Sequence, residues 1–382
     1  HGVSITGSPV EMTISAMVPD VGDALTLVND IHVDGNAGVP GAGTCARVGS
    51  VTGVSAGSDG SVFFVDRNSG DGRLRLLSPQ GELIDIAGGG SDQTDGIPAL
   101  NADISIVGDV QFDEANNRVF FTGTFDGASR VLRVNLASTP PQLFVYGGQP
   151  GALPGDGDGG LATSAHFLAA GDLAVDPTNP TALYVVDAGH DRIRRIDGLT
   201  IDGVYGVDDG NCATDAIALN DCADCNIAFT PEGDAMYVFG RICGSSPGGN
   251  TPGIVRLDLD GSDDVTGITH IAGSSGGNFE WDGLSALNGR FSDSGGLVVG
   301  ADDNLYFAET NNHRIGRLDL STNVLSVVMG DGTAGSNGNH GAAGSARLND
   351  PLRLEVRNGN DLVIADEGNH AVRMIWNLFD ES

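Results

Sequence analysis

Short runs of apolar, strand-forming residues recur along the chain, and each run ends in an acidic or small residue before a polar loop and a second run that contains Arg. The three clearest copies span residues 183–196, 305–318 and 362–375. Runs of Val, Ile, Phe and Tyr between turns rich in Gly, Asp and Asn are typical of β-strands joined by tight turns. The pattern therefore predicts a repeated antiparallel unit.

Weaker copies of the same unit begin at residues 62, 119 and 236, so the chain holds six copies. The residue that closes the first run stands at positions 66, 123, 187, 240, 309 and 366. Each copy also has an apolar run before this pair and another after it, as at residues 171–176 and 324–330. Four short strands per copy describe a propeller blade. We therefore predict an all-β fold, a six-bladed β-propeller of four-stranded blades.

The two ends of the chain complement each other. Few residues follow Ile375, so the sixth copy lacks its fourth strand, while residues 24–30 resemble that missing strand. We expect residues about 23–30 to complete the last blade and close the ring, which removes an exposed sheet edge. The predicted organisation is an N-terminal extension over residues 1–20, able to pack on a blade edge or on a neighbouring molecule, and a propeller over residues 21–382.

Charge excludes several functions. The chain has 51 acidic and 19 basic residues, all of the basic ones Arg, and a formal net charge of −32. Schiff-base enzymes and P-loop nucleotide enzymes need a Lys that this chain lacks. A strongly negative surface repels nucleic acid and anionic lipids, and no apolar run is long enough to cross a membrane. We therefore expect neither a nucleic-acid partner nor membrane insertion.

Cysteine usage predicts an exported protein, whether secreted, extracellular or periplasmic. Four of the five cysteines lie within about thirty residues, which favours local disulfides in an oxidising compartment. The pairing we favour is Cys212 with Cys222 and Cys225 with Cys243, which leaves Cys45 as a buried thiol or an intermolecular link. The chain starts at His1 without a signal-peptide pattern, as expected for a processed or trimmed chain.

The stretches at residues 187–193, 309–315 and 366–372 resemble the NHL repeat, as do the Gly- and Asp-rich segments at 155–167 and 330–348. The resemblance covers about residues 23–376. It implies a six-bladed propeller that serves as a platform for proteins, peptides or RNA, although RNA binders of the family present a basic face that this chain lacks. Related propellers include enzymes, notably the peptidyl-hydroxyglycine amidating lyases, which hold zinc with His, Tyr and Arg, as well as streptogramin lyases and gluconolactonases. Fold alone therefore leaves function open.

Side chains at the start of the innermost strands should share the space around the propeller axis. The candidate ligand-binding residues at this channel face are Arg47, Asp103, Asp109, His166, Asp172, Asn226, Arg290, Arg347, Arg353 and Glu355. Two readings stay open. Either these Arg and Asp residues pair with one another between blades, or Arg290, Arg347 and Arg353 present guanidinium groups to an anionic ligand, with the acids opposite.

Two metals are possible cofactors. Calcium would suit the oxygen donors of Asp109, Asp172, Asp156 and Asp158, although no EF-hand pattern occurs. Zinc is the less favoured alternative, through His166 with His32 and His340, whose spacing matches no compact ligand motif.

Residues that recur once per repeat point to structure rather than chemistry. We expect His190, His313 and His370 to share one turn position and to play a structural role. The acids that close the first runs should form ion pairs or hydrogen bonds with Arg192, Arg314 and their counterparts.

The sequence thus favours an exported, non-catalytic binding or assembly module that takes a protein, a peptide or a small anionic ligand at the channel face. A metal-dependent propeller enzyme resembling the amidating lyases is one alternative. A structural surface or filament subunit that assembles through residues 1–20, with self-association, is another.

Overall fold

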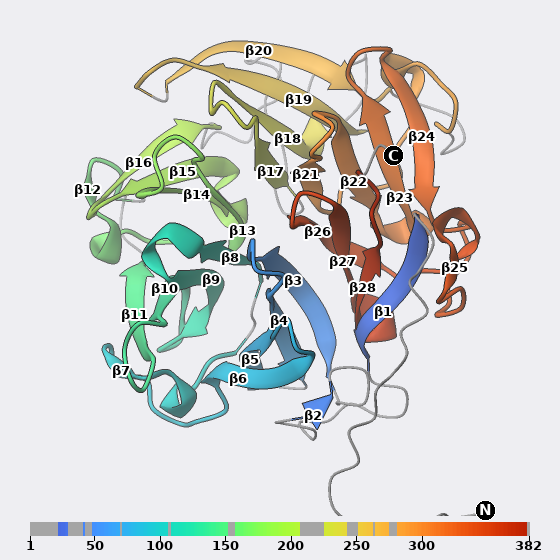
Figure 1. The fold of residues 1–382 in the computed structure, drawn as a ribbon. Helices are drawn as coiled ribbons and strands as arrows, with labels where there is room; N and C mark the ends of the chain where they lie inside the picture. Colours follow the sequence, from blue (N-terminus) through green and yellow to red (C-terminus); the bar gives the residue numbers. More distant parts are fainter. Residues whose placement is uncertain are drawn as a thin grey trace, which may run out of the picture.

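The computed structural model arranges six antiparallel sheets around a central axis (Figure 1). It describes residues 22–29, 41–42, 48–68, 71–105, 108–151, 157–206, 225–242, 251–262, 264–274 and 281–379. Each blade has four main strands, and the innermost strands surround the axis. The predicted six-bladed propeller is confirmed.

The strands of the first three blades follow chain order from the axis outward. Blade 1 has β3 (Ser50–Ala56), β4 (Val62–Asn68), β5 (Asp71–Leu77) and β6 (Glu82–Gly88); blade 2 has β8 (Val110–Asp113), β9 (Arg118–Phe125), β10 (Ala128–Asn135) and β11 (Gln142–Gly147); blade 3 has β13 (Ala170–Val175), β14 (Ala182–Asp187), β15 (Arg192–Asp197) and β16 (Thr200–Tyr205).

Blades 4 and 5 repeat this order, and blade 6 takes its last strand from the start of the chain. Blade 4 has β17 (Asn226–Phe229), β18 (Ala235–Ile242), β19 (Thr251–Leu259) and β20 (Val265–Ala272); blade 5 has β21 (Leu297–Val299), β22 (Leu305–Glu309), β23 (Arg314–Asp319) and β24 (Val324–Met329); blade 6 has β26 (Pro351–Arg357), β27 (Asp361–Asp366), β28 (Ala371–Ile375) and β1 (Asp23–Asn29).

Short elements that the apolar pattern did not predict join the blades. Two-residue strands extend four sheets at the outer edge: β2 (Gly41–Ala42), β7 (Ile97–Pro98), β12 (Gly160–Leu161) and β25 (Gly341–Ala342). Single 3₁₀ turns are η2 (Ala99–Asn101), η3 (Glu114–Asn116), η4 (Ala162–Ser164), η5 (Ala188–His190), η7 (Ala286–Asn288), η8 (Thr310–Asn312), η9 (Ala343–Ser345) and η10 (Glu367–Asn369).

The ring closes as the sequence predicted. Strand β1 pairs antiparallel with β28, from Ala24 opposite Ile375 to Asn29 opposite Ala371. Ala24 is fully buried, and β1 lies beside β28 in Figure 1. This pairing covers the edge of β28, which would otherwise be an exposed sheet edge.

A buried acid at the end of the second strand ties together three parts of a blade. Asp66, Asp187, Glu309 and Asp366 are all fully buried. Each accepts a hydrogen bond from a backbone N–H in the loop before the first strand, at 2.7 to 3.1 Å. In blades 1, 3 and 6 the acid also faces a buried Arg of the third strand, in the pairs Asp66–Arg75, Asp187–Arg194 and Asp366–Arg373.

In blade 5 the buried acid, Glu309, has different partners. Its third strand has Gly316 where blades 1, 3 and 6 have the buried Arg. The indole of Trp281 fills this space, and its Nε1–H donates to Glu309 at 2.7 Å. Arg314 completes the arrangement, because its Nε lies 2.7 Å from Glu309 while its guanidinium lies over the Trp281 ring. The predicted ion pair of Arg314 is thus present, although its packing partner is new.

The three repeated histidines do not share one position. His313 and His370 follow the 3₁₀ turn with φ of 52° and 51°, the left-handed conformation that ends it. In blade 3 Asp191 takes that place with φ of 51°, and His190 lies one residue earlier, with its Nδ1 2.8 Å from Asp187. The expected common position is therefore wrong for His190, because the loop of blade 3 places an acid at the left-handed residue.

Several expectations fall outside the described residues. They concern residues 1–20 and Cys45, Cys212, Cys222 and Cys243, so the domain boundary and the disulfide pairing stay predictions. Within the described part of the chain, no helix has the length and apolar composition needed to cross a membrane.

Candidate ligand site in the central channel

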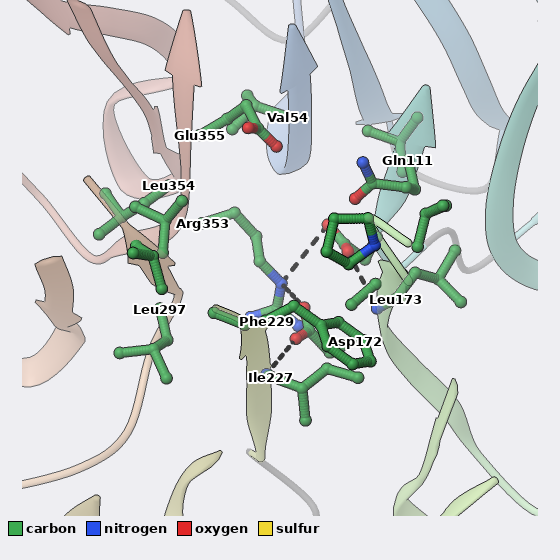
Figure 2. Close-up of a pocket in the computed structure, with 18 of the residues that line it drawn as sticks. Val54, Gln111, Asp172, Leu173, Ile227, Phe229, Leu297, Arg353, Leu354 and Glu355 are labelled. Atoms are coloured by element: carbon green, nitrogen blue, oxygen red, sulfur yellow. Dashed lines mark hydrogen bonds and ion pairs between the residues drawn. The ribbon is translucent and has the colours of Figure 1, made fainter. Parts of the chain in front are cut away.

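The innermost strands enclose a cavity of about 280 Å³ on the propeller axis. Strands β8, β13, β17, β21 and β26 and Val54 of β3 contribute its walls. Figure 2 shows the apolar side chains of Leu173, Ile227 and Leu297 around the polar groups at its centre. A concave site with apolar walls and a few convergent polar groups is the usual form of a small-molecule site.

Arg353 lies at the centre of the cavity and faces two acids from the opposite side of the ring. Its Nε is 3.1 Å from Asp172 Oδ1 and 3.6 Å from Asp109 Oδ1. Both carboxylates are almost fully buried. The dashed contacts in Figure 2 follow this triad from blade 6 to blades 2 and 3.

The same two acids also join successive blades. Asp109 Oδ2 accepts the backbone N–H of Leu173 in blade 3 at 3.2 Å. Asp172 Oδ2 accepts the N–H of Ile227 in blade 4 at 2.6 Å. Strands β13 and β17 thus each present one N–H to the acid of the blade before, which fixes the relative position of blades 2, 3 and 4.

Glycine at two positions of this ring allows the strands to approach one another. A Cβ on Gly53 would lie 2.9 Å from the Cα of Asp109, and a Cβ on Gly296 would lie 2.7 Å from the Cα of Arg353. Such contacts are too close for any side chain. Blades 1 and 5 consequently contribute no side chain to the Arg353 layer.

Burial and the neighbouring charged groups change the acidity of the pair. Burial, followed by the charge of Asp172, raises the pKa of Asp109 well above its ordinary value, while Arg353 opposes the change. Burial also raises the pKa of Asp172, again against the effect of Arg353. The pair therefore holds a proton more readily than isolated aspartates do.

Glu355 and Gln111 lie in the next layer of the channel. Figure 2 places the Glu355 carboxyl beside Val54, with Gln111 on the other side of the cavity. Within the described part of the chain, the one hydrogen bond of the Glu355 carboxyl is to the N–H of Val356, at 3.1 Å. Burial, followed by the charge of Asp172, raises the pKa of Glu355 to about 8. This carboxyl retains hydrogen-bonding capacity toward the cavity.

The structure gathers only part of the predicted set in the cavity: Asp109, Asp172, Arg353 and Glu355 line it. Asn226 is buried but lies outside the lining, and Asp103 accepts a hydrogen bond from Gln93 at 2.8 Å in the loop before β8. Arg47 and Asp156 lie outside the described residues.

The cluster of three arginines is not formed. Arg353 lines the cavity, whereas Arg347 pairs with Asp331 at 2.9 Å and Arg290 is absent from the lining. His166 lies against His190, with ring centroids 5.8 Å apart, rather than in the cavity. The first reading, pairing between Arg and Asp, describes Arg353, although the pair crosses the ring instead of joining neighbouring blades.

Several lining residues escaped the sequence analysis. Pro177, Phe229 and Pro231 come from the ends of innermost strands or the loops that follow them. These residues directly follow the aligned strand residues in the sequence, and that position was a signal that they could lie near the cavity. The spacing of the repeats does not predict the direction in which a loop runs, however.

The proposed metal donors have other partners. Asp158 pairs with Arg192 at 3.1 Å and with Arg194 at 2.6 Å, while Asp109 and Asp172 face Arg353. Over the described ranges, no group of three or more His, Cys, Asp and Glu side chains is arranged to hold a metal ion.

No protein-family model matches this chain, and no curated protein matches it. Among solved structures, it is similar to an auxiliary nutrient binding protein from Bacteroides thetaiotaomicron, with 16% identity over 92% of this chain and 75% of that chain and a TM-score of 0.65. A Bacteroides thetaiotaomicron protein of unknown function gives 17% identity, 93% and 75% coverage and a TM-score of 0.63. A gluconolactonase from Xanthomonas campestris has 13% identity over 94% of this chain and 98% of that chain, with a TM-score of 0.50. At these identities the likeness shows the propeller fold alone.

Proposed function

We propose that this chain is an exported, NHL-like propeller that binds a small polar ligand in its central channel without catalysing a reaction on it. The observation that carries the proposal is the cavity of about 280 Å³ in which Glu355 keeps hydrogen-bonding capacity beside the Asp109–Asp172–Arg353 triad. The nutrient binding protein among the structural neighbours is consistent with a binding role. Export rests on the acidic, Lys-free composition and the cysteine pattern.

Charge decides which ligand the channel favours. Three carboxyl groups line the cavity and one guanidinium group opposes them. The guanidinium already faces two of the acids, so an anion would find no unpaired positive group among the lining residues that the structure describes. In place of the anionic ligand expected from the sequence, we therefore propose a ligand with hydrogen-bond donors or a positive charge. Glu355 can accept hydrogen bonds from such a ligand or pair with its charge.

Choline tests this preference because its charge does not depend on pH. Titrations followed by saturation-transfer NMR at about pH 8.5 should show that choline binds. The neutral isostere of choline, which has carbon in place of nitrogen, should bind with an affinity at least about tenfold lower. Because a bound cation favours the ionised form of Glu355, choline affinity should rise as pH increases from about 6 to about 9.

The matched variant is Glu355→Gln, which keeps the size and removes the charge. It should bind choline and the isostere more nearly alike and lose the rise with pH. Equal binding of both probes to the unaltered protein, stronger binding of acetate, or no binding of any probe would each contradict the proposal. Stoichiometric zinc in protein purified without chelators would instead favour the metal-dependent enzyme.

A further inference from the structure

A second cleft, of about 360 Å³, lies between blades 2 and 3 and shares no lining residue with the channel. Blade 2 contributes Arg118 of β9, Arg133 of β10 and Phe144 and Tyr146 of β11. Leu199, in the turn between β15 and β16, faces it from blade 3 and is 73% exposed. Blades 2 and 3 are neighbours in Figure 1.

Arg133 occupies a position that four blades share. The aligned residues of blades 3, 4 and 5 are Arg195, Arg256 and Arg317, and each of the four lies opposite an aromatic residue of the second strand. In blades 3 to 5 an Asp stands two residues later and pairs with the Arg, at 2.7, 2.7 and 3.4 Å. The repeat therefore normally neutralises this guanidinium within its own strand.

Blade 2 lacks the neutralising acid. Asn135 stands where the other blades have Asp197, Asp258 and Asp319. Its Oδ1 accepts the N–H of Ala137 at 3.1 Å, as Asp319 accepts that of Ser321 at 3.0 Å, so the role of this residue in the turn is preserved. Only the negative charge is missing.

Arg133 consequently has no ion pair and no hydrogen bond to any residue that the structure describes. Its guanidinium lies over two rings instead, 5.2 Å from the centroid of Phe144 and 5.7 Å from that of Tyr146. Stacking on aromatic faces holds the guanidinium in place and leaves its N–H edge available.

The other charges of the cleft do not cancel that of Arg133. Arg118 brings a second guanidinium, placed over Phe120 and paired with Asp113 at 2.6 Å. Asp95 is the acid of the lining, and its Oδ1 accepts the N–H of Val145 at 2.7 Å. Burial, followed by the charge of Arg118, lowers the pKa of Arg133, while Tyr146 and Asp95 oppose the change.

We propose that this cleft binds a small organic carboxylate, with the carboxylate on the guanidinium of Arg133 and the apolar part against Phe144 and Leu199. A guanidinium group receives a carboxylate through two parallel hydrogen bonds, and stacking on Phe144 and Tyr146 fixes its orientation beforehand. The site is independent of the channel, which favours the opposite charge.

Benzoate is the probe, and neutral benzamide is its matched control. In NMR titrations at low salt, benzoate should bind saturably to the unaltered protein and at least about tenfold more tightly than benzamide does. Added salt should weaken benzoate binding and leave benzamide binding unchanged.

Two variants locate the site. Asn135→Asp restores the acid of blades 3 to 5, so it should reduce benzoate affinity at least about tenfold without lowering the melting temperature. Arg133→Gln should do the same, whereas Arg256→Gln, which removes a paired Arg of blade 4, should leave benzoate binding unchanged. Choline binding should be the same in all three, which separates this proposal from the channel.

Three results would overturn the proposal: no saturable benzoate signal in the unaltered protein, equal binding of benzoate and benzamide, or undiminished benzoate binding in a folded Arg133→Gln variant.

Discussion

The fold opposes the ionisation of Glu355 in the channel. Among the described residues its carboxyl has one hydrogen bond, to the N–H of the next residue, and its pKa is raised to about 8 by burial and by Asp172. An unfolded Glu ionises near its ordinary pKa. Between these two values the folded protein holds a proton that the unfolded chain releases, so this residue contributes stability at low pH and loses that contribution as pH rises.

The Glu355→Gln variant should therefore be more stable than the unaltered protein above about pH 8 and nearly equal to it below about pH 4.5. The difference should change by up to about 1.4 kcal/mol per pH unit in between. Urea unfolding at several pH values measures it, and Glu82→Gln, at an exposed position, serves as the control that should show no such change. A difference independent of pH would show that Glu355 ionises normally in the fold.

At the scale of the strand, the buried acid and the buried Arg are present or absent together in every blade except blade 5, where Glu309 contacts Trp281 and Arg314 instead. Blades 1, 3 and 6 have both, as in Asp66 with Arg75. Blade 2 has Gly123 and Leu132 at the same two positions, and blade 4 has Gly240 and Val255. The chain thus replaces the whole pair by small and apolar residues, because either partner alone would be a buried, unpaired charge.

A double-mutant cycle in blade 1 tests this coupling. Arg75→Leu alone should cost about 3–5 kcal/mol, since Asp66 then stays buried without its partner. Asp66→Gly together with Arg75→Leu copies blade 2, and its cost should be at least about 1 kcal/mol smaller than the sum of the two single changes. Urea unfolding provides the values. Additive costs would mean that the pair contributes no more than two independent residues.

The strands were predictable and their side-chain partners were not. Apolar runs of regular spacing, with a missing fourth strand at one end, were sufficient to predict six blades and the pairing of β1 with β28. The contact of Arg353 with Asp172 crosses the ring, and an alignment of the repeats does not show which residues of opposite blades lie close together. The same holds for Trp281, which occupies the space of a missing Arg from a loop outside the repeat pattern.

At the scale of the whole molecule, the formal net charge of −32 attracts cations and repels anions at long range. The channel adds carboxyl groups to that field, whereas the cleft between blades 2 and 3 opposes it locally through Arg133. Long-range repulsion should thus slow the approach of an anion to the cleft, and salt should reduce this repulsion while it weakens the final contact.

The ring is held closed by one strand contributed from the far end of the sequence. Strand β1 packs Ala24, Leu25 and Leu27 against blade 6 and its neighbours, and the backbone of Gly22 donates a hydrogen bond to Trp376.

Deleting residues 1–30 removes this strand and exposes the edge of β28, whereas deleting residues 1–18 leaves it intact. The longer deletion should lower the melting temperature by at least about 10 °C, through the loss of several buried side chains and a row of backbone hydrogen bonds, and should promote aggregation through the new edge. The shorter deletion should change the melting temperature little. Thermal unfolding and light scattering of the two proteins measure both effects, and equal, small losses would show that β1 is dispensable for closing the propeller.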